Sequence, residues 1–193
     1  MDRGDVEVEF SRTEYENRYQ QARVWMGEQG VDALLVSGEA NLHYLTGYRC
    51  PFWGVNPDAH LAILPLDPSK QAVLMLPEIF AFLASASWIT DVCYYRPNPL
   101  APAMGALDLL RSILDEEGLE AATIAVEAGT GLRNTLPILL LERLREQLPR
   151  LRIVDATEAL SRLRMSKSRA ALDVVRSTCH VSALGFQAGL CAV

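Results

Sequence analysis

Residues 31–49 read VDALLVSGEANLHYLTGYR, and the front of this stretch decides the fold class. It opens with Val31 to Val36, a run with a single charged residue, and Ser37-Gly38 closes that run. A short apolar run that stops at a serine and a glycine is typical of a buried strand. We therefore predict a strand at 31–36 in the interior of a sheet.

A helix is predicted directly before this strand. Four side chains recur at intervals of three or four residues, so they share one helix face: Tyr15, Tyr19, Ala22 and Met26. Ser11 or Thr13 can cap the start of the helix, and Gly30 stands at its end.

The next part of the chain predicts a hairpin and one more strand. Residues 60–64 and 71–76 are apolar runs that each stop at a proline, and the sequence 67–70, Asp-Pro-Ser-Lys, forms the turn between them. Residues 92–95 are a further strand, after a short helix at 78–87.

The second half alternates between helix and strand. Helices are predicted at 102–117, 136–148 and 157–164, and strands at 123–126 and 151–154. This alternation indicates an α/β domain of three layers, with a sheet of about five to six strands flanked by helices on both faces. The sheet should be mixed and mostly parallel, because the early hairpin is antiparallel.

Composition excludes several classes of function. The net charge is −6, whereas binding to nucleic acid needs clustered Lys and Arg, so no nucleic-acid partner is expected. The longest apolar stretch, 79–89, is shorter than the roughly 18 residues that span a membrane. Residues 1–10 are acidic and lack the apolar segment of a signal peptide. The four cysteines form no CxxC pair, so we expect reduced thiols and a cytoplasmic protein.

The last helix should start at Ser168 and have one apolar face. That face is formed by Leu172, Val175, Cys179, Ala183, Phe186 and Leu190. The sequence 189–193 is apolar and has no stop signal, so we expect a second domain to follow; the alternative is a C-terminal helix packed on its own domain. The polar link 164–168 gives a predicted boundary, with one domain at 11–164 and the hinge and last helix at 165–193.

No complete catalytic, cofactor or metal site is predicted within the chain. Residues 129–134, GTGLRN, follow a strand as a dinucleotide-binding loop does, but Asn134 takes the place of the third glycine, which favours an ordinary turn. His43, His60 and His180 share no ligand spacing, and no GxSxG, P-loop or HExxH motif is present.

The segment 41–58, NLHYLTGYRCPFWGVNPD, joins two predicted strands and is rich in aromatic residues around Arg49. Exposed aromatic side chains beside an arginine on a loop are typical of the rim of a binding site. Packing is an equally good interpretation, with these side chains under the sheet or at its edge: Tyr44, Leu45, Phe52 and Trp53.

Two motifs resemble one known family. The stretch 31–49 resembles the N-terminal domain of the creatinase/prolidase/aminopeptidase P family, the pita-bread metallopeptidases. LRMSKS at 163–168, followed by LDVVR at 172–176, is similar to the hinge where that family enters its catalytic domain. The resemblance extends from Ser11 to Val193, with Ala171 where the family often carries glutamate.

The resemblance implies the N-terminal, non-catalytic domain of a C–N bond hydrolase of the Xaa-Pro peptidase or creatinase type, truncated before its catalytic domain. Two Asp, one His and two Glu of that absent domain would hold a pair of divalent metal ions, and none of them maps onto this chain. The substrate would be a small peptide or a guanidino-type small molecule.

The resemblance also implies a homodimer in which this domain covers the mouth of a substrate site. The residues expected to bind substrate there are Arg49, Phe52, Trp53 and Asn56. One alternative is a stand-alone α/β ligand-binding or interaction module without catalysis. Another is a nucleotide-dependent enzyme that uses Gly129 and Gly131.

Overall fold

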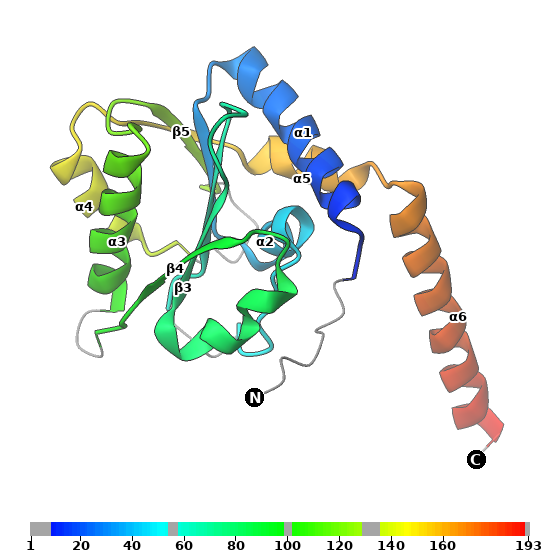
Figure 1. The fold of residues 1–193 in the computed structure, drawn as a ribbon. Coiled ribbons are helices and arrows are strands. Elements are labelled where there is room, and N and C mark those ends of the chain that lie inside the picture. Colours follow the sequence, from blue (N-terminus) through cyan, green and yellow to red (C-terminus); the bar gives the residue numbers. More distant parts are fainter. Residues whose placement is uncertain (1–8, 54–57, 99–101, 129–135, 192–193) are drawn as a thin grey trace.

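A single six-stranded sheet lies at the centre of the protein (Figure 1). The computed structural model describes residues 9–53, 58–98, 102–128 and 136–191. The order across the sheet is β4-β3-β2-β1-β5-β6. The strands are β1 (Ala33–Val36), β2 (Leu61–Pro65), β3 (Val73–Pro77), β4 (Asp91–Tyr95), β5 (Thr123–Val126) and β6 (Arg152–Asp155).

The predicted mixed sheet is confirmed, with β1 as a central strand. β2 pairs antiparallel with both β1 and β3, whereas the pairs β1–β5, β3–β4 and β5–β6 are parallel. In the β2–β3 hairpin, the Asp67 carboxylate accepts hydrogen bonds from the Ser69 backbone N–H (2.8 Å) and hydroxyl (2.7 Å). These bonds hold the predicted turn, because an Asp side chain that bonds two residues onward mimics a backbone turn.

Helices cover both faces of the sheet, as the alternation of elements predicted. The helices among the described residues are α1 (Arg12–Gln29), α2 (Glu39–Thr46), the 3₁₀-helix η1 (Glu78–Ala86), α3 (Pro102–Glu116), α4 (Ile138–Gln147), α5 (Thr157–Met165) and α6 (Arg169–Cys191), of which α6 lies away from the sheet. Only α2 was not predicted, because its residues were assigned to the long segment between two strands.

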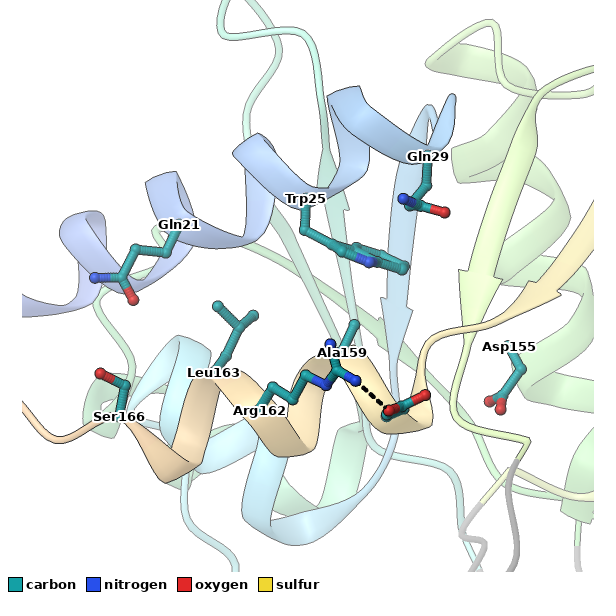
Figure 2. Close-up of a pocket in the computed structure, with 9 residues that line it drawn as sticks. Gln21, Trp25, Gln29, Asp155, Ala159, Arg162, Leu163 and Ser166 are labelled. Carbon is teal, nitrogen blue, oxygen red and sulfur yellow. Dashed lines mark hydrogen bonds and ion pairs between the residues drawn. The ribbon is translucent and has the colours of Figure 1, made fainter.

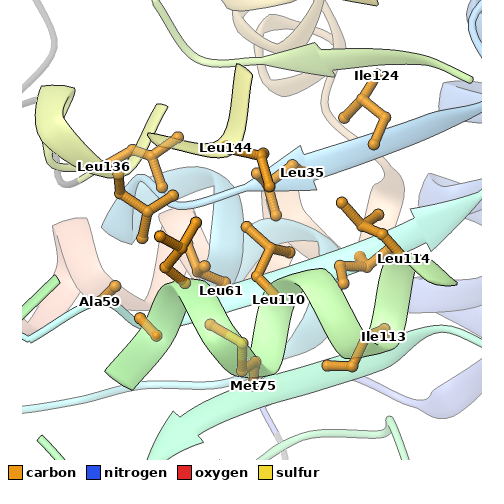
Figure 3. Close-up of a cluster of buried hydrophobic side chains, with 14 of the residues drawn as sticks. Leu35, Ala59, Leu61, Met75, Leu110, Ile113, Leu114, Ile124, Leu136 and Leu144 are labelled. Atoms are coloured by element: carbon orange, nitrogen blue, oxygen red, sulfur yellow. The ribbon is translucent and has the colours of Figure 1, made fainter. Parts of the chain in front are cut away.

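Alternating residues of β1 supply the two halves of the core. Leu35 packs with the buried side of α3 and α4, including Leu110 and Leu144 (Figure 3). Leu34 and Val36 point to the opposite face, where they join the buried residues of α1, α2 and α5. Successive side chains of a strand point to opposite faces of a sheet, so a strand covered on both sides is apolar throughout.

The start of α1 is capped by Ser11, which settles the choice left open by the sequence. The Ser11 Oγ accepts a hydrogen bond from the Glu14 N–H at 3.3 Å, and Gly30 adopts a left-handed conformation (φ 63°) at the other end.

We expect Ser11→Ala to lower the free energy of unfolding by about 0.5–1 kcal/mol, because the Glu14 N–H loses its side-chain acceptor and keeps only the Ser11 carbonyl. Thr13→Ala is the matched control and should change the stability by less than about 0.3 kcal/mol. Urea unfolding followed by circular dichroism measures both. Equal losses in the two variants would show that Ser11 does not act as the cap.

Helix α6 extends away from the rest of the molecule (Figure 1). The predicted start is confirmed, since the Ser168 Oγ accepts a hydrogen bond from the Ala171 N–H at 3.1 Å. None of the described residues of α6 is buried, and Phe186 is 70% exposed. The predicted apolar face therefore does not fold back on this domain. No helix in the described part of the chain is long and apolar enough to cross a membrane.

Candidate functional site

The candidate site is the α2–β2 loop, residues 47–60, of which the structure describes 47–53 and 58–60. Helix α2 fixes the start of this loop. Gly47 ends the helix with a positive φ of 76°, and its N–H donates to the His43 carbonyl at 2.9 Å. The last carbonyls of α2 are also paired: Trp88 Nε1 donates to Leu45 O at 2.9 Å, and Ser87 Oγ donates to Thr46 O at 2.8 Å.

A buried carboxylate fixes the other end of α2. Glu127, only 4% exposed, follows β5 and accepts hydrogen bonds from the backbone N–H groups of Ser37 (2.9 Å) and Gly38 (2.7 Å). Asn41 Nδ2 donates to the other carboxylate oxygen. The N-terminus of a helix binds anions through free N–H groups, and here the chain supplies that anion itself. A Cβ at position 38 would lie 2.4 Å from a carboxylate oxygen, so a larger residue there would force the Glu127 side chain to shift from this position.

This carboxylate occupies the place where nucleotides bind in many open α/β sheets. Such ligands bind beyond the carboxyl ends of parallel strands. They bind at the point where the chain leaves two adjacent strands toward opposite edges of the sheet. In this sheet that point lies between β1 and β5, and Glu127 fills it with hydrogen bonds to the chain's own groups. The predicted turn 129–134 lies outside the described residues.

The residues predicted to bind substrate are partly brought together. The Arg49 side chain is 71% exposed, and one of its guanidinium nitrogens lies 3.8 Å from a Glu9 carboxylate oxygen. Phe52 is 48% exposed, with its ring centroid 6.1 Å from that of Phe80. Trp53 is half-buried. Asn56 lies outside the described residues.

The base of the loop is an aromatic cluster around a buried histidine. His60 is 3% exposed, and its ring centroid lies 5.0 Å from those of Trp53 and Phe80 and 5.6 Å from that of Tyr48. His60 Nδ1 and Tyr48 Oη are 2.8 Å apart and share a hydrogen bond. Burial lowers the pKa of His60 to about 4, so the ring is neutral near pH 7.

A cavity of about 490 Å³ separates α2 from the loop. Glu39, His43 and Arg49 contribute its polar groups. His43 Nε2 lies 2.9 Å from a Glu9 carboxylate oxygen. Burial lowers the pKa of His43, although Glu9 opposes this shift. The cavity is therefore lined by charges of opposite sign, those of the Glu39 carboxylate and the exposed Arg49 guanidinium.

A larger cavity, of about 680 Å³, lies between α1, α2 and the start of α6. Beneath it the buried Arg18 donates to Glu14 Oε1 (2.9 Å) and to the Tyr44 carbonyl (3.0 Å). The guanidinium also lies over the rings of Phe10 and Tyr44. Tyr44 is thus packed, with its hydroxyl donating to Leu163 O at 3.0 Å, and is not part of an exposed rim.

A third hollow, of about 420 Å³, lies between α1 and α5 (Figure 2). Trp25 extends from α1 toward α5, as Figure 2 shows. The Asp155 carboxylate accepts from the Thr157 N–H at 3.0 Å, and Arg162 pairs with Glu158 at 2.6 Å. These charged groups are engaged within α5 or at its start, so they do not identify a ligand for the hollow.

The described residues do not fit a metal site. Among them, no three His, Cys, Asp or Glu side chains are grouped so that they could hold a metal ion. His43 and His60 are held in separate surroundings, and His180 lies on exposed α6. The pair of divalent ions implied by the family resemblance therefore finds no ligand set in this part of the chain.

Three features of the site were not predicted: α2, the role of Glu127 and the burial of His60. The signal for Glu127 was weak, because an acidic residue after a buried strand is common. Tyr48 was grouped with the exposed aromatic residues, yet it is buried. Both interpretations of 41–58 thus hold in part: Tyr44, Leu45 and Tyr48 are packed, whereas Arg49 and Phe52 are exposed.

Comparison with solved structures finds the same fold in peptidases. The dipeptidase PepE from Mycobacterium ulcerans is 22% identical, with a TM-score of 0.62, and the match covers 85% of this chain and 40% of that one. A prolidase from Thermococcus sibiricus is 16% identical, with a TM-score of 0.65 and coverage of 82% and 39%. The present chain therefore spans about two fifths of these enzymes.

A separately solved domain matches over nearly its whole length. The N-terminal domain of cytoplasmic peptidase PepQ from Mycobacterium tuberculosis is 18% identical, with a TM-score of 0.55, and the match covers 76% of this chain and 98% of that one. No curated protein sequence matches.

The family comparison covers more than half of the chain. Residues 18–166 match the profile of the creatinase/prolidase N-terminal domain, from the middle of α1 to the residue after α5. This chain therefore belongs to the creatinase/prolidase N-terminal domain family.

Proposed function

We propose that this chain is the non-catalytic N-terminal domain of a prolidase-like C–N bond hydrolase, of the Xaa-Pro peptidase or creatinase type. Its role is to form a homodimer and to cover the mouth of a substrate site. The observation that carries this proposal is the α2–β2 loop, which presents Arg49 and Phe52 to solvent above a packed aromatic base. The similar structures include a dipeptidase and a prolidase by name.

The exposed residues of the loop suit a small peptide. A guanidinium such as that of Arg49 binds a carboxylate with two parallel hydrogen bonds. Phe52 and Trp53 supply apolar cover, and large aromatic side chains often contribute most of the binding energy at such rims. Asn56 completes the proposed set of substrate-binding residues. A guanidino-type substrate would instead use the aromatic faces and the neighbouring carboxylates.

The chemistry belongs to another domain in this proposal. We assign residues 11–164 to the N-terminal domain, and 165–193 to the hinge and the first helix of a catalytic domain. The apolar face of α6, exposed here, would then pack within that catalytic domain. The divalent metal pair would be bound there as well. We place the protein in the cytoplasm, as the name of the similar PepQ suggests.

The decisive test uses the full-length parent enzyme. Arg49→Ala and Trp53→Ala should each raise KM for a dipeptide substrate roughly 3- to 10-fold, with kcat within about twofold, because a rim binds the substrate and its transition state alike. Ile138→Ala, at an exposed apolar residue of α4, is the matched control. Unchanged KM in both loop variants would contradict substrate capping.

Oligomeric state separates this proposal from the stand-alone module. Sedimentation of the full-length parent should give a dimer, and the chain 1–193 alone should show no dipeptidase or creatinase activity with added divalent metal. A parent that remains monomeric would contradict the dimer. A gene that encodes no catalytic domain would instead favour a stand-alone binding module.

A further inference from the structure

A buried histidine lies directly under the loop proposed to cover the substrate site. His60 precedes β2, and three aromatic rings surround it: those of Tyr48, Trp53 and Phe80. Proteins usually fill such a place with an apolar side chain, and a buried polar ring is costly unless it is hydrogen-bonded. The histidine therefore calls for an explanation beyond packing.

The hydrogen bond to Tyr48 supplies that explanation. Tyr48 Oη and His60 Nδ1 are 2.8 Å apart, and both residues are buried. Burial raises the pKa of Tyr48, so its hydroxyl remains protonated. A buried hydroxyl and ring nitrogen that meet inside an apolar cluster hold one relative position, because breaking the pair costs both groups a hydrogen bond away from water.

Two partners of His60 flank the exposed part of the loop in the sequence. Tyr48 directly precedes Arg49, and Trp53 directly follows Phe52. The centroid of the Phe52 ring lies 6.1 Å from that of Phe80, and the Phe80 ring also packs against the His60 imidazole. The stretch 49–52 is exposed except for the buried Cys50, and the residues that flank both of its ends contact the same buried ring.

We infer that His60 is a positioning residue, which holds Tyr48 and Trp53 so that the stretch 49–52 keeps one conformation above the cavity. The positioning of Trp53 by His60 does not depend on the function of the chain. Its consequence for substrate binding rests on the proposed function. A loop that is already ordered before the substrate binds loses less conformational entropy on binding, which is the advantage of preorganisation.

Two variants remove the hydrogen bond from opposite sides. His60→Phe keeps an aromatic ring under Trp53 but loses Nδ1, and Tyr48→Phe loses only the hydroxyl. If His60 served packing alone, His60→Phe would leave the loop unchanged. Tyr44→Phe is the matched control, because it deletes a tyrosine hydrogen bond to Leu163 O elsewhere on the same helix and loop segment.

The position of Trp53 can be read directly by ¹⁹F NMR of the chain labelled with 5-fluorotryptophan. Three resonances are expected, for Trp25, Trp53 and Trp88. The resonance that disappears in Trp53→Phe is that of Trp53. We expect His60→Phe and Tyr48→Phe each to shift or broaden the Trp53 resonance, whereas Tyr44→Phe leaves it in place. An unchanged Trp53 resonance in both variants would overturn the inference, whatever the function of the protein.

The kinetic arm uses the full-length parent. His60→Phe should raise KM as much as Trp53→Ala does, roughly 3- to 10-fold with kcat unchanged, and the double variant should add nothing further. If Trp53 moves while Trp53→Ala leaves KM unchanged, the proposed function fails and the positioning role of His60 stands. If Trp53→Ala raises KM but His60→Phe does not, the link between position and binding is wrong.

Discussion

Replacing Glu127 by alanine should lower the free energy of unfolding by about 3–5 kcal/mol, the range that follows when a buried hydrogen-bonded charged group is deleted. This is the largest effect that we expect from a single substitution in this chain. Three donors lose their acceptor at once: the backbone N–H groups of Ser37 and Gly38, and the side-chain amide of Asn41. Two of these three donors gain no ready access to water, because Ser37 and Asn41 are buried.

A glutamine at the same position is the matched control. Glu127→Gln keeps the shape of the side chain and one oxygen that can accept from Ser37 and Gly38. Its new N–H₂ group faces Asn41, whose Oδ1 has no hydrogen-bond partner among the described residues. The Asn41 amide can turn so that this oxygen accepts from the new group. We expect Glu127→Gln to cost about 1–2 kcal/mol, clearly less than the alanine variant.

Urea unfolding at pH 7, with the slope of each transition compared, measures both losses. An alanine variant within about 1 kcal/mol of the wild type would show that the carboxylate contributes little to the junction of β1 and α2. A glutamine variant as unstable as the alanine variant would show that the negative charge, rather than the hydrogen bonds, stabilises this junction.

The importance of Glu127 illustrates which parts of the fold could be predicted. Short apolar runs identified the six strands of the described sheet, and periodicity identified most of the helices, because each element carries its own apolar pattern over a few consecutive residues. Glu127 acts across 86 to 90 positions of the chain, on Asn41, Gly38 and Ser37. No local pattern records such a contact, so the residue looked like an ordinary acid at a strand end.

Helix α2 was missed for a related reason. It has eight residues, starts at a glycine without a side-chain cap and ends at another glycine. Isolated helices of this length are marginal in water, so its stability comes from tertiary contacts such as those of Glu127, Ser87 and Trp88. Once α2 is formed, the candidate loop shrinks to the residues after Gly47, and Tyr44 leaves the exposed set.

The exposed residues of the loop were easier to predict than their support. Arg49 and Phe52 are exposed as a binding rim requires, and the sequence showed them on a segment rich in aromatic residues. The sequence did not show that His60 would lie beneath them. A single histidine next to an apolar run forms no repeating sequence pattern from which its burial could be predicted. Its burial depends on the aromatic rings that η1 and the loop place around it.

The buried His60 should make the protein less stable in mild acid. Its pKa is about 4 in the folded protein and 6.5 when exposed, so between these values the unfolded chain binds a proton that the folded chain excludes. Stability from this residue is therefore complete above about pH 7.5 and falls as pH decreases toward 4. The expected loss is about 2 kcal/mol at pH 5 and about 3 kcal/mol at pH 4.

His60→Phe isolates this contribution, because every other ionisable group is shared with the wild type. His43, whose pKa burial also lowers, and Asp58, whose pKa burial raises, remain in both proteins and cancel from the difference. The variant should be about 1 kcal/mol less stable than the wild type at pH 7.5, since Tyr48 loses its hydrogen bond to the imidazole. At pH 5 the order should reverse, because the variant has no ring to protonate.

Urea unfolding of both proteins at half-unit steps from pH 7.5 to 4.5 would show two stability curves that cross between pH 5 and 7. Tyr48→Phe is the control: it loses the same hydrogen bond but retains the imidazole, so its curve should run below that of the wild type with a similar slope. Parallel curves for His60→Phe and the wild type would mean that His60 is protonated as readily in the folded protein as in the unfolded chain. The imidazole would then be accessible to water, and the closed aromatic base beneath Arg49 and Phe52 would not exist in solution.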